Sequence, residues 1–288
     1  MVSIPISHLI PASPCYDLHC HSTASDGVLS PTEVVLRAAE YGVTTLALTD
    51  HDTVVGLGEA QIAAKQVNLK LINGVEISTQ WKNHSIHIVG LNFEPTHSAM
   101  VELLQQQQDL RQKRAKEISE KLAKIGVENA FFEASALTQG EITRAHYARY
   151  LVQIGKAANQ QQAFKKFLRQ GKVAYVKTNW CDIPTAIQTI HASGGIAVVA
   201  HPLRYQMTTR KIKKLLFEFK QWGGDALEVA GCGQTQEQRQ LLIRWAKENG
   251  LMGSVGSDFH FPCQWTELGK SLYLNENDPE LPVVWQLF

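Results

Sequence analysis

The sequence predicts an α/β fold in which a mainly parallel sheet is covered by helices. Short apolar segments rich in β-branched residues alternate with amphipathic helical patterns over much of the 288 residues. Nearly continuous apolar strands are typical of parallel sheets that are buried on both faces. Several helical patterns also end at a glycine, the usual residue after a helix C-terminus. The pattern alone leaves a closed barrel and an open doubly wound sheet as alternatives.

Seven segments have the length and composition of strands. They are residues 15–20, 44–50, 69–76, 85–91, 195–201, 226–231 and 251–258. The third and fourth segments are too close in the sequence for a helix to fit between them. We therefore expect a hairpin-like connection at that point, because only antiparallel strands can be joined by a short turn.

Five helical patterns lie between these strands. They cover residues 30–42, 54–67, 182–195, 210–224 and 235–250. The first has the sequence signature of a capping box, with Ser30 before the helix, Pro31 at its first position and Glu33 in its first turn. Gly42 is expected to end it.

Residues 97–178 interrupt the alternation and are predicted to form a long helical insertion. They divide the α/β unit into a first part, residues 15–96, and a second part, residues 179–288. The insertion holds 14 Lys and Arg against 7 Asp and Glu, a charge of +7, so the rest of the chain carries +1 − 7 = −6. This basic surface is either an ordinary lysine-rich helical face or a lobe that receives an anion beside an acidic, cation-binding core.

The composition favours a protein of a reducing compartment. The five cysteines are scattered and never form CxxC, which argues against a disulfide framework and against a thiolate zinc site. Residues 1–14 lack the basic and apolar regions of a signal peptide, and no apolar run reaches transmembrane length. We therefore expect a cytoplasmic protein with no membrane association, and the sequence indicates no protein partner.

Imidazole and carboxylate side chains stand at the ends of almost all the predicted strands. They are His19, His21, Asp50, His51, Asp52, Glu76, His87, His201, Asp258 and His260. Active sites of α/β folds form at the carboxyl ends of the strands, so these side chains should meet at one rim. Nitrogen and oxygen ligands without thiolate suit Zn²⁺, Mn²⁺ or Fe²⁺. Their number exceeds the needs of one ion, which favours a cluster that assists displacement at phosphorus.

The strand-end motifs resemble those of the polymerase and histidinol phosphatase (PHP) superfamily of metal-dependent phosphoesterases. In chain order they are "DLHCHSTASDG", "LALTDHDT", "GVEIS", "HIVGL", "AHP" and "GSDFH". The resemblance implies a distorted (β/α)7 barrel with a helical insertion domain. The chain is most similar to the branch that contains the 3′,5′-nucleoside bisphosphate phosphatases and the 5′-to-3′ exoribonuclease ribonuclease AM. Here "ITRAHYARYLV", "GKVAYV" and "AHPLRY" carry the likeness.

The resemblance also implies two or three divalent ions, with Mn²⁺ expected and Zn²⁺ or Fe²⁺ as alternatives. The first would be held by His19, His21, Glu76 and Asp258, the second by Glu76, His87 and His201, and the third by Asp26, His51 and His260. Glu76 would thus bridge two ions. We expect Asp50 to orient His51 rather than to bind metal, and Glu228 is left without a role.

The expected reaction is in-line attack of a metal-activated hydroxide on a phosphoester. The resemblance implies catalytic roles for Glu76, Asp258, Arg144 and His146 and phosphate contacts for Arg144 and His146. Lys172 and Arg204 are further candidates for phosphate contacts, with solvated surface charge as the alternative. A metal-bound water or His146 would protonate the leaving oxygen.

The expected substrate is a nucleotide or single-stranded RNA with a terminal phosphate. The function implied is that of a 5′-to-3′ exoribonuclease and 3′,5′-nucleoside bisphosphate phosphatase, with Arg111, Lys113 and Arg114 of the basic lobe holding RNA. Three alternatives stay open. They are a small-molecule phosphatase such as one for histidinol phosphate, an amidohydrolase-type barrel, and a catalytically silent PHP module that serves for binding.

Overall fold

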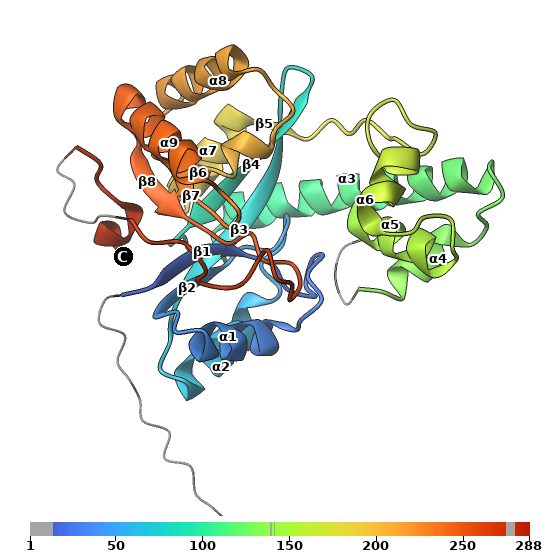
Figure 1. Cartoon of the computed structure of the whole chain (residues 1–288), viewed down its shortest axis with the longest axis horizontal. Coiled ribbons are helices and arrows are strands. Elements are labelled where there is room, and N and C mark those ends of the chain that lie inside the picture. The colour runs from blue at the N-terminus through green and yellow to red at the C-terminus, as the bar shows by residue number, and fades with distance from the viewer. Residues whose placement is uncertain (1–13, 139, 141, 275–279) are drawn as a thin grey trace, which may run out of the picture.

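The computed structural model describes residues 14–138, 140, 142–274 and 280–288. The segment over which we predict no signal peptide therefore lies almost wholly outside the described residues. The chain forms a barrel-shaped α/β unit with a helical lobe beside it (Figure 1). No helix among the described residues is long and apolar enough to cross a membrane.

The sheet contains the seven predicted strands and one short additional strand. Its order is β1-β2-β3-β4-β6-β7-β8, and the strand bounds are β1 Tyr16–Cys20, β2 Thr45–Leu48, β3 Lys70–Trp81, β4 His84–Leu91, β6 Ile196–Val199, β7 Ala226–Ala230 and β8 Met252–Val255. The additional strand β5, Cys181–Asp182, pairs with β3 outside this path. A strand of two residues has no detectable sequence pattern, which is why the sequence analysis did not find it.

The two edges of the sheet meet and nearly close it into a barrel. The backbone N–H of His21 donates to the carbonyl of Phe259 over 2.8 Å, and the N–H of Asp258 donates to the carbonyl of His19 over 2.8 Å. These bonds join the end of β1 to the segment that follows β8. The structure thus confirms the barrel and excludes the open sheet.

One strand of the barrel runs against all the others. β4 is antiparallel to both β3 and β6, whereas the remaining neighbours in the path are parallel. The predicted hairpin is confirmed, because Trp81 pairs with His84 across a two-residue turn. The structure also corrects the predicted positions of two candidate ligands. Glu76 lies within β3 rather than at its end, and His87 reaches the rim from the amino-terminal half of the reversed strand β4.

The five predicted helices of the barrel are present. Their bounds are α1 Pro31–Glu40, α2 Leu57–Gln66, α7 Ile183–Ala192, α8 Thr209–Gln221 and α9 Gln236–Asn249. The capping box of α1 is confirmed: Ser30 Oγ accepts from the N–H of Glu33, and the Glu33 carboxylate accepts from the N–H of Ser30. Two short 3-10 turns, η2 Pro202–Arg204 and η3 Val284–Leu287, complete the unit.

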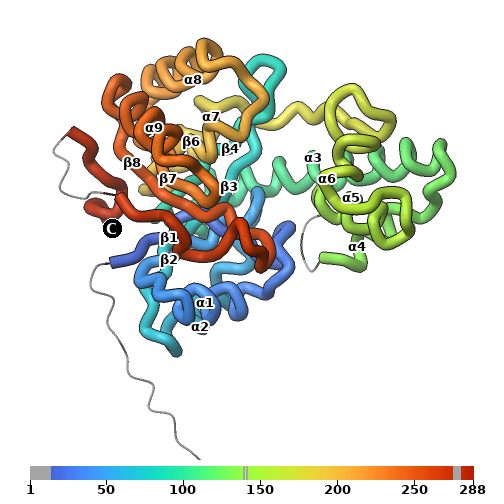
Figure 2. Tube along the Cα trace, viewed as in Figure 1, coloured from blue at the N-terminus to red at the C-terminus, as the bar shows by residue number. Residues whose placement is uncertain are grey.

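The helical lobe has a hydrophobic core of its own. Its elements are α3 Ser98–Ala123, α4 Ala130–Ser135, α5 Arg144–Gln153, α6 Gln160–Ala163 and the π-helical turn η1 Phe164–Leu168. Figure 2 shows the chain leaving the barrel along α3 and returning through an extended segment before α7. Met100 and Leu103 of α3 pack into the barrel core, whereas Ile118 and Leu122 pack with Tyr147 in the lobe. One helix therefore spans both cores, and the domain boundaries at residues 97 and 178 stay predictions.

Candidate metal centre

Glu76 stands at the middle of the cluster of predicted metal ligands. Its carboxylate is buried, and five imidazoles surround it. Glu76 Oε1 lies 2.9 Å from His87 Nδ1 and 3.0 Å from His201 Nε2, while Oε2 lies 2.8 Å from His51 Nδ1. Each carboxylate oxygen thus faces different nitrogen atoms, as an oxygen pair that bridges two cations must.

The two histidines of the first motif meet the opposite end of the chain. The Nε2 atoms of His19 and His21 are 3.2 Å apart. His21 Nε2 lies 3.1 Å from Asp258 Oδ1, and His19 Nε2 lies 3.3 Å from Glu76 Oε1. The four residues predicted for the first metal position are therefore in mutual contact.

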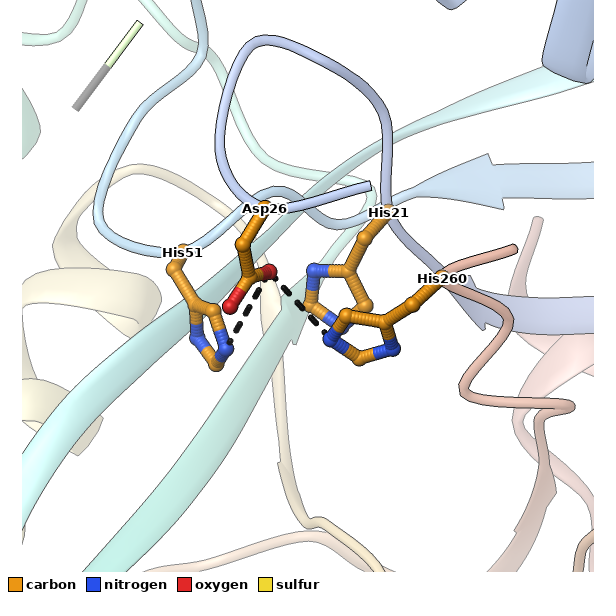
Figure 3. Close-up of side chains that lie close together, drawn as sticks. All are labelled: His21, Asp26, His51 and His260. Atoms are coloured by element: carbon orange, nitrogen blue, oxygen red, sulfur yellow. Dashed lines mark ion pairs between the residues drawn. The ribbon is translucent and has the colours of Figure 1, made fainter. Parts of the chain in front are cut away.

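Asp26 gathers the residues predicted for the third position. Its Oδ1 atom lies 3.2 Å from His260 Nε2 and 3.8 Å from His51 Nε2, and His21 completes the group (Figure 3). Ligand atoms of all four side chains lie within 4.8 Å of one another. The resemblance did not include His21 in this group.

The donor set fits divalent cations. Glu76 Oε2, His51 Nδ1 and Asp26 Oδ1 are buried, yet none has a hydrogen-bond partner within the described part of the chain. Buried polar atoms in proteins normally have a hydrogen-bond partner. Buried nitrogen and oxygen atoms that face one another without such bonds therefore need a bound partner between them. Nitrogen and carboxylate oxygen are ligands of Zn²⁺, Mn²⁺ and Fe²⁺. The site is thus suited to a cluster of such ions, while their number and identity are not determined by the side chains.

The charges of Glu76 and His21 also suit metal binding. Burial alone would raise the pKa of Glu76, but the surrounding imidazoles of His87, His51 and His19 outweigh it and hold that pKa well below its usual range. Burial, followed by the neighbouring His260 and His51, lowers the pKa of His21. The carboxylate is therefore ionised and the His21 imidazole is neutral, which are the states that bind a cation.

Glu228, to which the sequence analysis gave no role, orients two predicted ligands. Its Oε2 atom lies 3.2 Å from His19 Nδ1 and accepts a 2.7 Å bond from the N–H of His201. A carboxylate at Nδ1 fixes the proton there and leaves Nε2 free to bind metal. In the sequence, the feature that could have indicated this role was the position of Glu228 near the end of a predicted strand.

Asp50 has a different role from the expected one. It does not hold His51, because its carboxylate accepts bonds from the N–H and hydroxyl of Ser22 and from the hydroxyl of Ser25, at 2.6–2.8 Å. These bonds fix the turn that carries Asp26. By holding the loop after β1, Asp50 thus positions Asp26 within the group of residues predicted for the third metal.

The backbone is strained at two of the predicted ligands. His201 has φ 28° and Asp258 has φ 52°, values in the left-handed region that side chains rarely adopt. Gly256 lies so close to His19 that a Cβ there would come within 2.2 Å of the His19 Cβ. Such strain persists where the fold over-determines it, typically at functional sites.

A basic cleft opens directly beside the cluster. It is lined by Asp26, His51 and His87 on the barrel side and by Arg114, Arg144, Phe164 and Trp180 on the other. Arg114 and Arg144 are partly buried, and neither has a carboxylate partner among the residues that the structure describes. Burial, together with the charges of Arg144 and Arg111, lowers the pKa of Arg114 well below its usual range. Cations crowded in this way favour an anion between them.

The other predicted substrate residues lie in different settings. His146 is buried in the first turn of α5, where its Nδ1 accepts a 3.0 Å bond from the N–H of Thr143. Burial lowers the pKa of His146 to about 4, so it is neutral at neutral pH. Arg204 contacts the carboxylate of Asp258. Lys172 is exposed and lines none of the described clefts.

Arg111 and Tyr147 make buried contacts within the protein. Arg111 is buried, donates from Nε to Asp52 over 2.7 Å, and donates from Nη2 to Ser78 over 2.8 Å. Its charge is therefore neutralised within the protein, and the expectation that it holds RNA loses its support. Tyr147 is buried and donates to the carbonyl of Ala115.

The sequence has clear relatives among known proteins. A family model for the PHP domain matches residues 17–191, which is more than half of the chain. The chain belongs to the PHP domain family. Its resemblance to that superfamily, inferred from the motifs, is thereby confirmed.

Two curated relatives cover almost the whole length of this PHP protein. A "5′-3′ exoribonuclease" of Haemophilus influenzae is 64% identical over 95% of this chain and 98% of its own. A "3′,5′-nucleoside bisphosphate phosphatase" of Chromobacterium violaceum is 39% identical over 85% and 87%. Both names describe phosphoric ester hydrolases.

A solved structure confirms the fold of this PHP protein. It comes from Chromobacterium violaceum, is 37% identical and has a TM-score of 0.88 over 94% of this chain and 95% of its own. It is described as an amidohydrolase with bound sulfate and no metal. Among the described residues, no lysine forms an ion pair with Asp26, Glu76 or Asp258. The bridging lysine that we associate with amidohydrolase-type barrels therefore has no counterpart at the candidate site.

Proposed function

We propose that the protein is a metal-dependent phosphoesterase that acts as a 5′-to-3′ exoribonuclease and a 3′,5′-nucleoside bisphosphate phosphatase. The observation that carries this proposal is the pair Arg114 and Arg144 in a cleft that opens onto Asp26, His51 and His87. Neither cation has a carboxylate partner among the residues that the structure describes. A substrate with two phosphates one nucleoside apart fits both features. The names of the curated relatives support the same two activities.

The nine predicted ligands would hold two or three divalent ions, with Mn²⁺ expected. His19, His21 and Asp258 form one end of the cluster, and Asp26 and His260 the other. Bound divalent ions would supply a water of lowered pKa and neutralise charge that develops at phosphorus. The same chemistry releases phosphate from a bisphosphate or a nucleotide from RNA. Cytoplasmic location stays a prediction.

The residues of the chain bind and orient the substrate. Arg114 and Arg144 hold the terminal 5′-phosphate, which places the following phosphate at the cluster. Arg204, held beside Asp258, stabilises charge at the same end. His146 is neutral and buried, so it has no imidazolium proton to give, and we assign protonation of the leaving oxygen to water.

A direct test uses two substrates in parallel. The purified protein with Mn²⁺ is given a short 5′-monophosphorylated RNA and a 3′,5′-bisphosphonucleoside, and products are resolved over time. We expect mononucleotides released stepwise from the 5′ end of the RNA and phosphate released from the small compound. Phosphate release with the RNA untouched would make the protein a nucleotide phosphatase only, and no reaction with either would refute the proposal.

The arginine pair is tested by Arg144→Met. Loss of a charge-assisted contact to phosphate should lower kcat/KM for the 5′-phosphorylated RNA by on the order of a hundredfold. The preference over the same RNA with a 5′-hydroxyl should disappear. Arg210→Met, which removes an exposed arginine from α8, is the matched control. An unchanged preference in Arg144→Met would show that the terminal phosphate is held elsewhere.

A further inference from the structure

A second groove lies between the lobe and the barrel. It is lined by Asn159, Gln161, Gln162, Phe164, Lys165 and Arg169 of the lobe and by Gln206 of the barrel. Its empty space is about 1040 Å³, compared with about 420 Å³ for the cleft of the arginine pair. The groove therefore has room for a ligand larger than a single phosphate.

The side chains of this groove match single-stranded nucleic acid. Among the described residues, no carboxylate lines it. Lys165 and Arg169 are exposed, and neither has an ion-pair partner within the described ranges. Asn159 and Gln162 are occupied with local backbone bonds. The two cations suit phosphates, while the amides of Gln161 and Gln206 suit sugar and base atoms.

The local fold keeps the two cations directed outward. Lys165 belongs to η1, a π-helical turn, and Arg169 directly follows it. Such turns are rare in proteins, but those that occur are often found at functional sites. Ala163 and Leu168 on either side of Lys165 are buried in the lobe core. This anchoring places Lys165 and Arg169 on the surface that faces Gln206.

The groove adjoins the cleft of the arginine pair. Phe164 lines both, and its ring lies 5.8 Å from the guanidinium of Arg144. We propose that this groove binds the nucleotides that follow the scissile phosphate in a single-stranded RNA. The inference rests on the proposed function, and it adds a binding surface that a 3′,5′-bisphosphonucleoside is too short to reach.

The test is a change of charge in the groove. The double variant Lys165→Glu/Arg169→Glu is compared with Lys116→Glu/Lys124→Glu, which changes two exposed lysines of the same lobe that line none of the described clefts. For each protein, kcat/KM is measured with the bisphosphonucleoside and with 5′-phosphorylated RNAs of two, four and ten nucleotides, at several salt concentrations.

We expect the groove variant to lose about tenfold in kcat/KM on the ten-nucleotide RNA and to keep its rate on the bisphosphonucleoside within about twofold. The salt dependence for long RNA should become shallower by about one to two units of slope. The control should match the wild type. Equal losses on all substrates, no loss on long RNA, or the same loss in the control would each overturn the proposal. If wild-type protein cleaves no RNA, the proposed function itself fails.

Discussion

The two carboxylate oxygens of Glu76 face three predicted ligands, His87, His201 and His51. A carboxylate that served a single metal ion would not need so many neighbouring ligands. We expect Glu76→Gln to lose bound metal and to reduce turnover by on the order of a hundredfold or more, since the bridging charge is removed while the shape is kept. Elemental analysis, activity and circular dichroism would measure this. Glu267→Gln, which breaks the ion pair with Arg37, is the control. Full metal content in Glu76→Gln would contradict the assignment.

Glu228 acts one step behind the cluster. We expect Glu228→Gln to weaken metal affinity by about 10–100-fold, because His19 loses the carboxylate that fixes the proton on Nδ1. Titration of the metal-free protein with Mn²⁺ would give the affinity without any assay of turnover. An unchanged affinity would mean that the backbone alone orients His19.

At this scale the sequence predicted which residues gather at the cluster better than it predicted the side chains that support them. His19, His51 and Asp258 could be found because a strand end is a local pattern and a PHP motif surrounds each one. Arg114 was predicted only together with Arg111 and Lys113, since an arginine on a lysine-rich helix looks the same in the sequence whether it faces solvent, a cleft or a buried carboxylate. The partners of Asp50 and Glu228 depend on strands that are distant in the sequence.

Among the elements, α3 is held to the barrel by a buried ion pair. Arg111 of α3 contacts Asp52, which directly follows His51, and both side chains are almost fully buried. We expect Arg111→Met to lower the free energy of unfolding by about 3–5 kcal/mol, because Asp52 is left as an unpaired buried charge. Urea denaturation would measure the change.

The double variant Arg111→Met/Asp52→Asn provides the control for this pair. It should recover part of the lost stability, since no unpaired charge remains. If Arg111→Met alone were as stable as the wild type, the contact would not anchor the lobe.

Local patterns predicted most elements, and long-range pairing explains those that were missed. The capping box of α1 and the hairpin of β3 and β4 depend on residues within a few positions of one another. The continuation of β3 to Trp81 depends on its pairing with β4, and β5 exists only because it pairs with β3. The partner of β5 is not visible in a sequence window around that strand, because Cys181 pairs with the distant Thr79.

For the whole molecule, His146 links stability to pH. Its pKa is about 4 in the folded chain because of burial, against an ordinary 6.5. The unfolded chain therefore binds one more proton between about pH 6.5 and pH 4, so the free energy of unfolding falls as the pH is lowered through that window. The full loss from this group is up to roughly 3 kcal/mol.

Comparison with His146→Gln isolates this contribution. Glutamine at the third position of a helix can also cap it, and it does not titrate. With metal removed, we expect the wild type to lose more of its unfolding free energy than the variant does as the pH falls from 7 to 4. A difference independent of pH would show that His146 is not buried as a neutral group.

The closure of the barrel has a consequence for the order in which the protein is made. His19 and His21 stand near the beginning of the described chain, while Asp258 and His260 stand near its end. Both backbone and side-chain bonds join β1 to the segment after β8 across that span. A chain still emerging from the ribosome therefore lacks two of the residues at which the cluster forms. Contacts of such separation form late in folding. The centre can thus assemble only after residues 258–260 have been made, and a product truncated before them lacks two of the predicted ligands.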